Sequence, residues 1–129
     1  MSSLVFFSID VGRLAAFYES ALGVTSKHDP WGGIRLLGDG VDILVHPVPA
    51  AIAETIEIHT PPEPLEGAAI KPVFDVRSLD RALETALANG GVDTGRTFRI
   101  DDLTFHDVLD PDGNVIQLRA HTRSPEDES

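Results

Sequence analysis

The sequence predicts an α+β fold built from two βαβββ modules. The prediction rests on two sequence patterns, each of which occurs twice along the chain. An amphipathic helix closed by glycine is written as VGRLAAFYESALGV at 11–24 and again as LDRALETALANGGV at 79–92. An acidic turn followed by a strand is written as LLGDGVDILVHP from Leu36 and as LDPDGNVIQLRA from Leu109. A repeat of this length predicts two similar modules with a ligand cavity between them.

The length and the residue types exclude several classes of protein. With 129 residues the chain is one domain that is large enough to bury a core. It contains no cysteine, which excludes a disulfide framework, a thiolate zinc site and a cysteine nucleophile. No apolar run approaches the roughly 18 residues that span a bilayer, and no secretory signal opens the chain. We therefore expect a cytoplasmic protein without a membrane partner.

The charge balance is strongly acidic, with a net charge of −11. Binding of nucleic-acid phosphates needs a basic face, so we expect no nucleic-acid partner. The excess of carboxylates keeps the protein soluble and would attract a cationic ligand.

The first half of the chain predicts one complete module. A strand at 4–9 is followed by Asp10, which is a suitable helix N-cap. The next helix has one apolar stripe, and Gly23 ends it. Three further strands are predicted at 24–28, 33–37 and 41–47. The stripe consists of Leu14, Phe17, Tyr18, Ala21 and Leu22.

The second half repeats the order of elements. A strand at 69–76 precedes Ser78, which caps a helix that Asn89, Gly90 and Gly91 end. Pro72 cannot donate to a strand ladder, so this strand is expected at a sheet edge or with a bulge. The predicted last three strands are 94–100, 103–109 and 114–120. The module boundaries follow as about 3–47 and about 69–121.

The connection at 48–68 is rich in proline and glutamate, and an acidic tail at 122–129 is expected to be disordered. Within the connection, the alternating segment TIEIHT at 55–60 fits an extra strand, a lid over the cavity or a contact with a second subunit. The sequence leaves these three alternatives open. It also leaves open whether the cavity forms within one chain or between two.

Three stretches in this order resemble the vicinal-oxygen-chelate superfamily, which contains glyoxalase I, bleomycin-resistance proteins and extradiol dioxygenases. They are ID-VGRLAAFYESALGV, DVRSLDRALETALANGGV and LDPDGNVIQL, and they cover nearly the whole chain. The resemblance implies curved mixed sheets that enclose a cavity, and it implies a homodimer.

Metal-binding members of that superfamily place four ligands, usually His, Glu or Gln, on cavity-facing strand positions. The motifs put these positions at Ser3 and Gln117, and the internal repeat pairs them with Lys71 and Leu44. Leucine has no donor atom, and a lysine ammonium repels a cation. Because a divalent ion needs several convergent N or O donors, we expect no metal and no cofactor here.

One alternative register takes TIEIHT as the last strand of the first module, which puts Glu57 in place of Leu44. A metal-dependent enzyme of this fold would then use Glu57, His59, His46 and Gln117 as ligands. The ungapped repeat from Leu36 to Pro47 favours Leu44 instead.

Strand alternation predicts which side chains line the cavity. Trp31 lies in a loop after the second strand and is expected to stack on a planar ligand or a partner chain. His46 is the histidine best placed for acid–base chemistry, and Lys71 is the other catalytic candidate. The predicted ligand-binding set is Ser3, Val5, Phe7, Trp31, Asp42, Leu44, His46, Lys71, Val73, Asp75, Gln117 and Arg119.

The sequence therefore favours a metal-independent protein that binds or sequesters a small molecule. Two alternatives remain, and they place the protein among the enzymes. One is a metal-dependent lyase or oxidoreductase of the glyoxalase or dioxygenase type. The other is a metal-free lyase or isomerase with Lys71 or His46 as its base.

Overall fold

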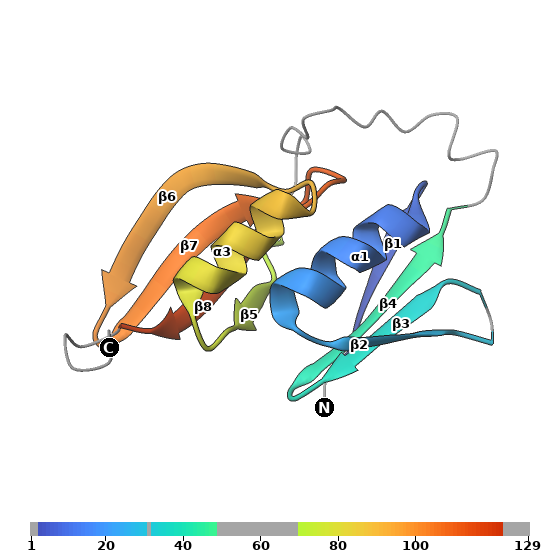
Figure 1. The fold of residues 1–129 in the computed structure, drawn as a ribbon, viewed down its shortest axis with the longest axis horizontal. Coiled ribbons are helices and arrows are strands. Elements are labelled where there is room, and N and C mark those ends of the chain that lie inside the picture. Colours follow the sequence, from blue (N-terminus) through green and yellow to red (C-terminus); the bar gives the residue numbers. More distant parts are fainter. Residues whose placement is uncertain (1–2, 31, 49–69, 123–129) are drawn as a thin grey trace.

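The computed structural model describes residues 3–30, 32–48 and 70–122, and it confirms two βαβββ modules (Figure 1). The first module consists of β1 (Leu4–Ser8), α1 (Val11–Leu22), β2 (Thr25–His28), β3 (Ile34–Gly38) and β4 (Val41–Pro47). The second consists of β5 (Val73–Asp75), α3 (Leu79–Ala88), β6 (Val92–Ile100), β7 (Leu103–Leu109) and β8 (Val115–His121). Neither α1 nor α3 is long and apolar enough to cross a membrane.

Each module forms a four-stranded mixed sheet with the same strand order. The orders are β1-β4-β3-β2 and β5-β8-β7-β6, with the first pair parallel and the others antiparallel. Val5 lies opposite Leu44 in the first sheet, and Val73 lies opposite Gln117 in the second. Val5 therefore corresponds to Val73, and Leu44 to Gln117. The internal sequence repeat matches the same residues.

Both helices begin and end where the sequence predicts. Asp10 accepts a hydrogen bond from the backbone N–H of Arg13 at 3.1 Å, and Gly23 adopts a left-handed φ of 65°. Ser78 caps α3 by accepting from the N–H of Arg81 at 3.3 Å. The apolar stripe of α1 is buried against its own sheet, where Ile43 and Leu36 lie beneath it.

The strand that opens the second module is shorter than predicted. The sequence indicated 69–76, but β5 spans only Val73–Asp75, because Pro72 lacks an N–H group. The Pro72 carbonyl still accepts from the backbone N–H of Gln117 at 2.8 Å. β5 is an edge strand, as expected for a strand next to proline. The predicted strand at 55–60 lies outside the described residues, as does all but the first residue of both the connection and the tail.

The modules meet through α1 and α3, which lie side by side in Figure 1. Tyr18 of α1 is fully buried, and its hydroxyl donates to the Oδ2 atom of Asp110 at 2.6 Å, across the junction. Its ring also lies 5.9 Å from the ring of Phe74. Phe17 approaches Gly91 so closely that a Cβ there would lie 2.6 Å from the phenylalanine ring. Aromatic side chains of one module therefore pack directly on the other.

The acidic turn at 110–113 is the part of the second module that receives Tyr18. The Asp110 side chain accepts from the backbone N–H groups of Asp112 and Asn114, each at 2.9 Å. Gly113 has a positive φ of 91°, which glycine adopts readily in such a turn. Arg13 of α1 reaches the same turn and lies 3.1 Å from the Asp112 carboxylate. The turn thus closes a hairpin and also docks on α1.

Burial changes the ionisation of both partners in this contact. It raises the pKa of the Tyr18 hydroxyl well above its ordinary value, and the neighbouring Asp110 raises it further. Burial also raises the pKa of Asp110, while the hydrogen bonds from Tyr18 and Asn114 oppose that rise. Tyr18 therefore keeps its proton and remains the donor at neutral pH.

We expect Tyr18→Phe to lower the free energy of unfolding by about 1–3 kcal/mol, because Asp110 loses a donor while it stays buried. The measurement is urea denaturation at neutral pH. Thr85→Val is the control, since its exposed hydroxyl donates to the Arg81 carbonyl, and surface changes cost only about 0.5 kcal/mol. Equal losses in the two variants would contradict a special role for the junction bond.

Candidate functional site

The described residues of the predicted ligand-binding set lie on the two sheet faces that point away from the helices. We call these the helix-free faces. In β4, Ile43 and Val45 are buried in the core, so Asp42, Leu44 and His46 point to the opposite side. The helix-free face of the first module carries Ser3, Val5, Phe7, Arg35, Leu37, Asp42, Leu44 and His46. That of the second carries Lys71, Val73, Asp75, Phe98, Ile100, Phe105, Asp107, Gln117 and Arg119. Trp31 lies outside the described residues.

A polar cluster occupies the centre of the second helix-free face. The Lys71 Nζ atom donates to Oδ2 of Asp107 at 2.9 Å, and the Gln117 Nε2 atom donates to Oδ1 of the same carboxylate at 2.9 Å. Asp107 is only 1% exposed, and Gln117 is buried as well. A buried carboxylate needs such donors, because leaving it unpaired is costly. The cluster therefore fixes the lysine ammonium and the glutamine amide in place.

Sequence reasoning placed Lys71 and Gln117 on this face but missed Asp107, which joins them. The signal was present in the hairpin that the acidic turn closes. A turn centred on Pro111 and Asp112 pairs Leu109 with Val115, and counting two residues along each strand pairs Asp107 with Gln117. Asp107 could thus have been placed beside Gln117 from the turn alone.

Arg119 and Asp75 neutralise each other at the edge of the same face. The Nε and Nη2 atoms of Arg119 donate to the two oxygens of Asp75 at 2.6 and 2.8 Å. These hydrogen bonds lower the pKa of the Asp75 carboxyl. Asp75 and Arg119, both in the predicted ligand-binding set, therefore pair with each other in the structure.

The first helix-free face has a different polar cluster. Ser3 donates its hydroxyl hydrogen to one oxygen of Asp42, and Arg35 donates to the other at 2.9 Å. Arg35 lies opposite Leu44 in the sheet, as Asp107 lies opposite Gln117 in the second module. The same structural position therefore carries a cation in one module and an anion in the other.

His46 lies at the end of the first helix-free face. Its Nδ1 atom is 2.8 Å from the Pro47 carbonyl oxygen, and its ring meets the edge of Phe7 at 5.8 Å. A carbonyl can only accept, so Nδ1 carries the hydrogen and Nε2 keeps its lone pair in the neutral ring. By contrast, the His106 ring contacts Asp93 at 2.6 Å and the His121 ring contacts Asp102 at 3.3 Å. His59 lies outside the described residues.

Apolar side chains surround these polar clusters and are unusually exposed for their size. Phe7 is 63% exposed and Val5 is 52% exposed in the first module. On the second face, Phe98 stacks on Phe105 with ring centroids 5.0 Å apart and stays 43% exposed. Leu37, Val73 and Ile100 add further apolar surface. A few fixed polar groups in an apolar surround are typical of a small-molecule site.

The four positions that correspond to metal ligands do not fit a divalent ion. Leu44 offers no donor atom, and the Lys71 ammonium is engaged with Asp107. Ser3 gives its hydroxyl hydrogen to Asp42, which leaves Gln117 as the one side chain of a usual ligand type. Within 3–30, 32–48 and 70–122, no three His, Asp or Glu side chains converge as a metal site would require.

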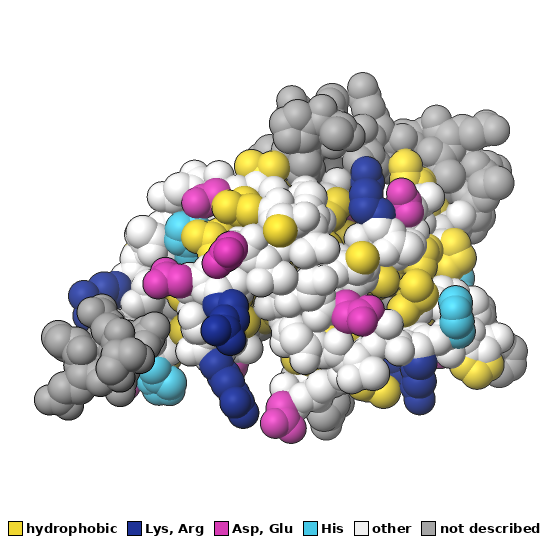
Figure 2. Space-filling view, viewed as in Figure 1, with side chains coloured by type: hydrophobic (Ala, Val, Ile, Leu, Met, Phe, Trp, Pro, Cys, Tyr) yellow, Lys and Arg dark blue, Asp and Glu magenta, His cyan; other side chains and the backbone are white. Residues whose placement is uncertain are grey.

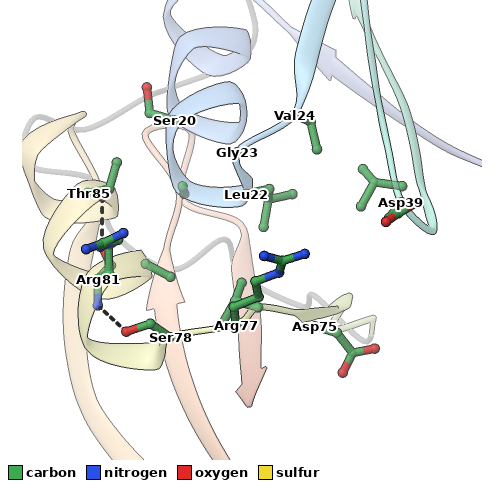
Figure 3. Close-up of a pocket in the computed structure, with 14 residues that line it drawn as sticks. Ser20, Leu22, Gly23, Val24, Asp39, Asp75, Arg77, Ser78, Arg81 and Thr85 are labelled. Atoms are coloured by element: carbon green, nitrogen blue, oxygen red, sulfur yellow. Dashed lines mark hydrogen bonds between the residues drawn. The ribbon is translucent and has the colours of Figure 1, made fainter. Parts of the chain in front are cut away.

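A cavity of about 540 Å³ lies elsewhere, at the junction of the modules (Figure 3). It is bounded by the end of α1, the β3–β4 turn, and the segment from β5 into α3. Of the predicted ligand-binding residues, Asp75 lines this cavity, and no sequence pattern pointed to its other lining residues. The binding role of the helix-free faces stays a prediction.

The comparisons with known proteins agree with this architecture. Residues 3–119 match the family of the glyoxalase-like domain. No functionally curated protein matches the chain. Many solved structures match, at identities that show the fold alone, and together with the family match they confirm the resemblance to the vicinal-oxygen-chelate superfamily.

Three of these structures illustrate the range. A glyoxalase/bleomycin resistance protein/dioxygenase family enzyme from Burkholderia phytofirmans is 20% identical, with a TM-score of 0.70 over 93% of this chain and 97% of its own. A glyoxalase/bleomycin resistance protein from Albidiferax ferrireducens is 17% identical, with a TM-score of 0.68 over 94% and 98%. The fosfomycin resistance protein FosX from Mesorhizobium loti is 14% identical, with a TM-score of 0.65 over 95% and 92%.

We expect Lys71→Met to lower the free energy of unfolding by about 1 kcal/mol, because it removes one of the donors to the buried Asp107 carboxylate. The loss is kept small because Lys71 is partly exposed to solvent. The same change should cost less when Asp107 is already Asn, so a double-mutant cycle measured by urea denaturation should show coupling. Lys27→Met is the control, since this lysine on β2 is exposed and makes no recorded ion pair among the described residues. An equal cost in both backgrounds would show that Lys71 and Asp107 do not interact.

Proposed function

We propose that this chain, which belongs to the glyoxalase-like family, binds or sequesters a small organic molecule on its helix-free faces without a metal ion. The observation that carries the proposal is the cluster of Lys71, Asp107 and Gln117. In metal-binding relatives of this fold, the positions of Lys71 and Gln117 hold ligands. Here one of them carries a fixed ammonium, and Asp107 satisfies it.

The ammonium supplies the positive charge that a metal would otherwise supply at this position. A lysine Nζ atom has three hydrogens, and Asp107 accepts one of them at 2.9 Å. The remaining N–H groups, with the side-chain oxygen of Gln117, suit a ligand that presents a carbonyl or carboxylate oxygen beside a donor. Phe105 lies two residues along β7 from Asp107, and its ring stacks on that of Phe98 in β6. The two rings suit a planar part of the same ligand.

Exposure of the apolar residues supports a homodimer. Val5 and Phe7 on one face, and Val73 and Phe98 on the other, are each more than two-fifths exposed in a single chain. Burial of such side chains is favourable, and a second copy of the chain that covers them would also enclose the ligand. The names of the structural neighbours, which include bleomycin and fosfomycin resistance proteins, motivate capture of a small organic molecule. We expect the protein in the cytoplasm.

A second candidate function is a metal-free lyase or isomerase. It is favoured by the His46 ring, whose Nε2 atom is free to take a proton while Nδ1 is held by the Pro47 carbonyl. Lys71 is less suited to be the base, because its amine already donates to a carboxylate. A metal-dependent enzyme would require Glu57 and His59, both of which lie outside the described residues.

Native mass spectrometry combined with elemental analysis tests the first proposal. The purified protein should have the mass of two chains, should retain a low-mass organic molecule, and should hold far less than one equivalent of Zn, Ni, Fe or Mn. Lys71→Met should lose the organic molecule, whereas Arg99→Met, which removes a positive charge from the opposite face of the second sheet, should keep it. Stoichiometric metal that is removed by Gln117→Ala would overturn the metal-free reading, and a single-chain mass would overturn the dimer.

If the chain is an enzyme, His46→Gln should lower turnover of the retained molecule by about 10²–10⁴, which is the usual contribution of a general base. Product formation would be followed by mass spectrometry under single-turnover conditions. His28→Gln is the matched control, since His28 is exposed on β2 and does not lie on the helix-free face. Turnover that is indifferent to the His46 change would exclude this histidine as the base.

A further inference from the structure

The junction cavity is a second candidate site, separate from the helix-free faces. Its walls come from both modules: Leu22 ends α1, Val24 follows that helix, Val41 opens β4, and Arg77 precedes α3. Its volume of about 540 Å³ is enough for a small organic molecule. Figure 2 shows basic side chains over the start of α3, with a notch between them and the β3–β4 turn. In Figure 3 the Arg77 guanidinium points toward Leu22.

Arg77 lines this cavity and has no carboxylate partner among the described residues, in a chain with 21 acidic and 10 basic residues. Arg13, Arg35, Lys71 and Arg119 are all ion-paired. Among the described residues, no carboxylate accepts from Arg77, nor from Arg81, which lies one turn further along the cavity wall. The cavity therefore presents two guanidinium groups that no carboxylate of the described residues neutralises.

The carboxylates near the cavity explain why these arginines stay free. Asp75 lies two residues from Arg77, but both of its oxygens are taken by Arg119 at 2.6 and 2.8 Å. Asp39 lines the cavity from the β3–β4 turn, on the side away from α3 (Figure 3). An anion that enters would thus meet Arg77 on one side and a single negative charge on the other.

Part of the wall is apolar, beside the hydroxyl groups of Ser20, Ser78 and Thr85. Leu22, Val24, Val41 and Val76 are partly buried members of the hydrophobic core, and each presents some surface to the cavity. Such a wall stabilises an alkyl group by about 25 cal/mol for each Å² that it removes from water. The lining therefore combines one cationic end with a short apolar surface.

We propose that this cavity binds a small monocarboxylate with a short branched apolar tail. The carboxylate pairs with the Arg77 guanidinium, whose planar fork matches two carboxylate oxygens. The tail packs on Leu22, Val24 and Val41. Asp39 disfavours a second negative charge on the ligand, so a phosphate dianion is bound less well. Because both modules supply the walls, an occupied cavity also stabilises their junction.

Isothermal titration calorimetry on the full chain tests the proposal with three probes. The first is 4-methylpentanoate, the second is inorganic phosphate, an anion without an apolar tail, and the third is 3-methylbutylamine, a cation with a similar branched tail. The carboxylate should bind saturably, more tightly than phosphate, and the amine should not bind. Arg77→Gln should weaken carboxylate binding by about tenfold or more, because a charge-assisted hydrogen bond is worth at least that factor. Arg99→Gln makes the same charge change at an exposed site on β6 and should leave binding unchanged.

The Asp39→Asn variant provides a second, independent test of the proposal. It should improve the binding of phosphate relative to 4-methylpentanoate, because it removes the opposing charge. The proposal is overturned if the carboxylate does not saturate, if phosphate binds more tightly to the unmodified chain, or if Arg99→Gln weakens binding as much as Arg77→Gln. Binding at the helix-free faces depends on Lys71, so Lys71→Met should leave these titrations unchanged, and the two sites can fail separately.

Discussion

The hydrogen bond from Tyr18 to Asp110 is the contact on which the arrangement of the two modules depends. It is buried, and it joins residues that are 92 positions apart in the sequence. Each partner would be costly to bury alone, since the hydroxyl needs an acceptor and the carboxylate needs donors. Any rotation of the second module on α1 that breaks this bond therefore leaves the Tyr18 hydroxyl without an acceptor. Asp110 then keeps only the donors of its own turn. The aromatic contacts around it are less directional, so the hydrogen bond fixes the orientation.

That orientation determines what lies on either side of the junction. Tyr18 is one turn before Leu22, and Asp110 is held by a turn that packs against the same helix. The end of α1 is thereby brought to the segment that carries Arg77. The junction cavity is a consequence of this docking, because neither module has the complete wall by itself. The helix-free faces, by contrast, belong to each sheet separately.

The parts of the fold that the sequence predicts are those encoded by neighbouring residues. Asp10, Gly23 and Ser78 act as caps because short-range backbone geometry requires them, and the apolar stripe of α1 needs only the helical period. The same stripe contained Tyr18 without revealing that its hydroxyl crosses to the other module. Arg77 stood in a segment predicted as a strand-to-helix turn, and nothing local to it indicated a cavity. Contacts between modules depend on how the finished units pack, which periodicity does not encode.

Comparison of the two modules shows which face of each sheet is free to change. On the helix-packed side, Ile43 and Ile116 occupy the same position and are both buried, because the helix above leaves little room for another shape. On the helix-free side, matched positions hold Leu44 and Gln117, or Arg35 and Asp107. A residue there need only satisfy its own polar atoms, as Lys71 does with Asp107. Packing therefore keeps the helix-packed sides of the two modules alike, while the helix-free sides can carry different side chains as long as their buried polar atoms are paired.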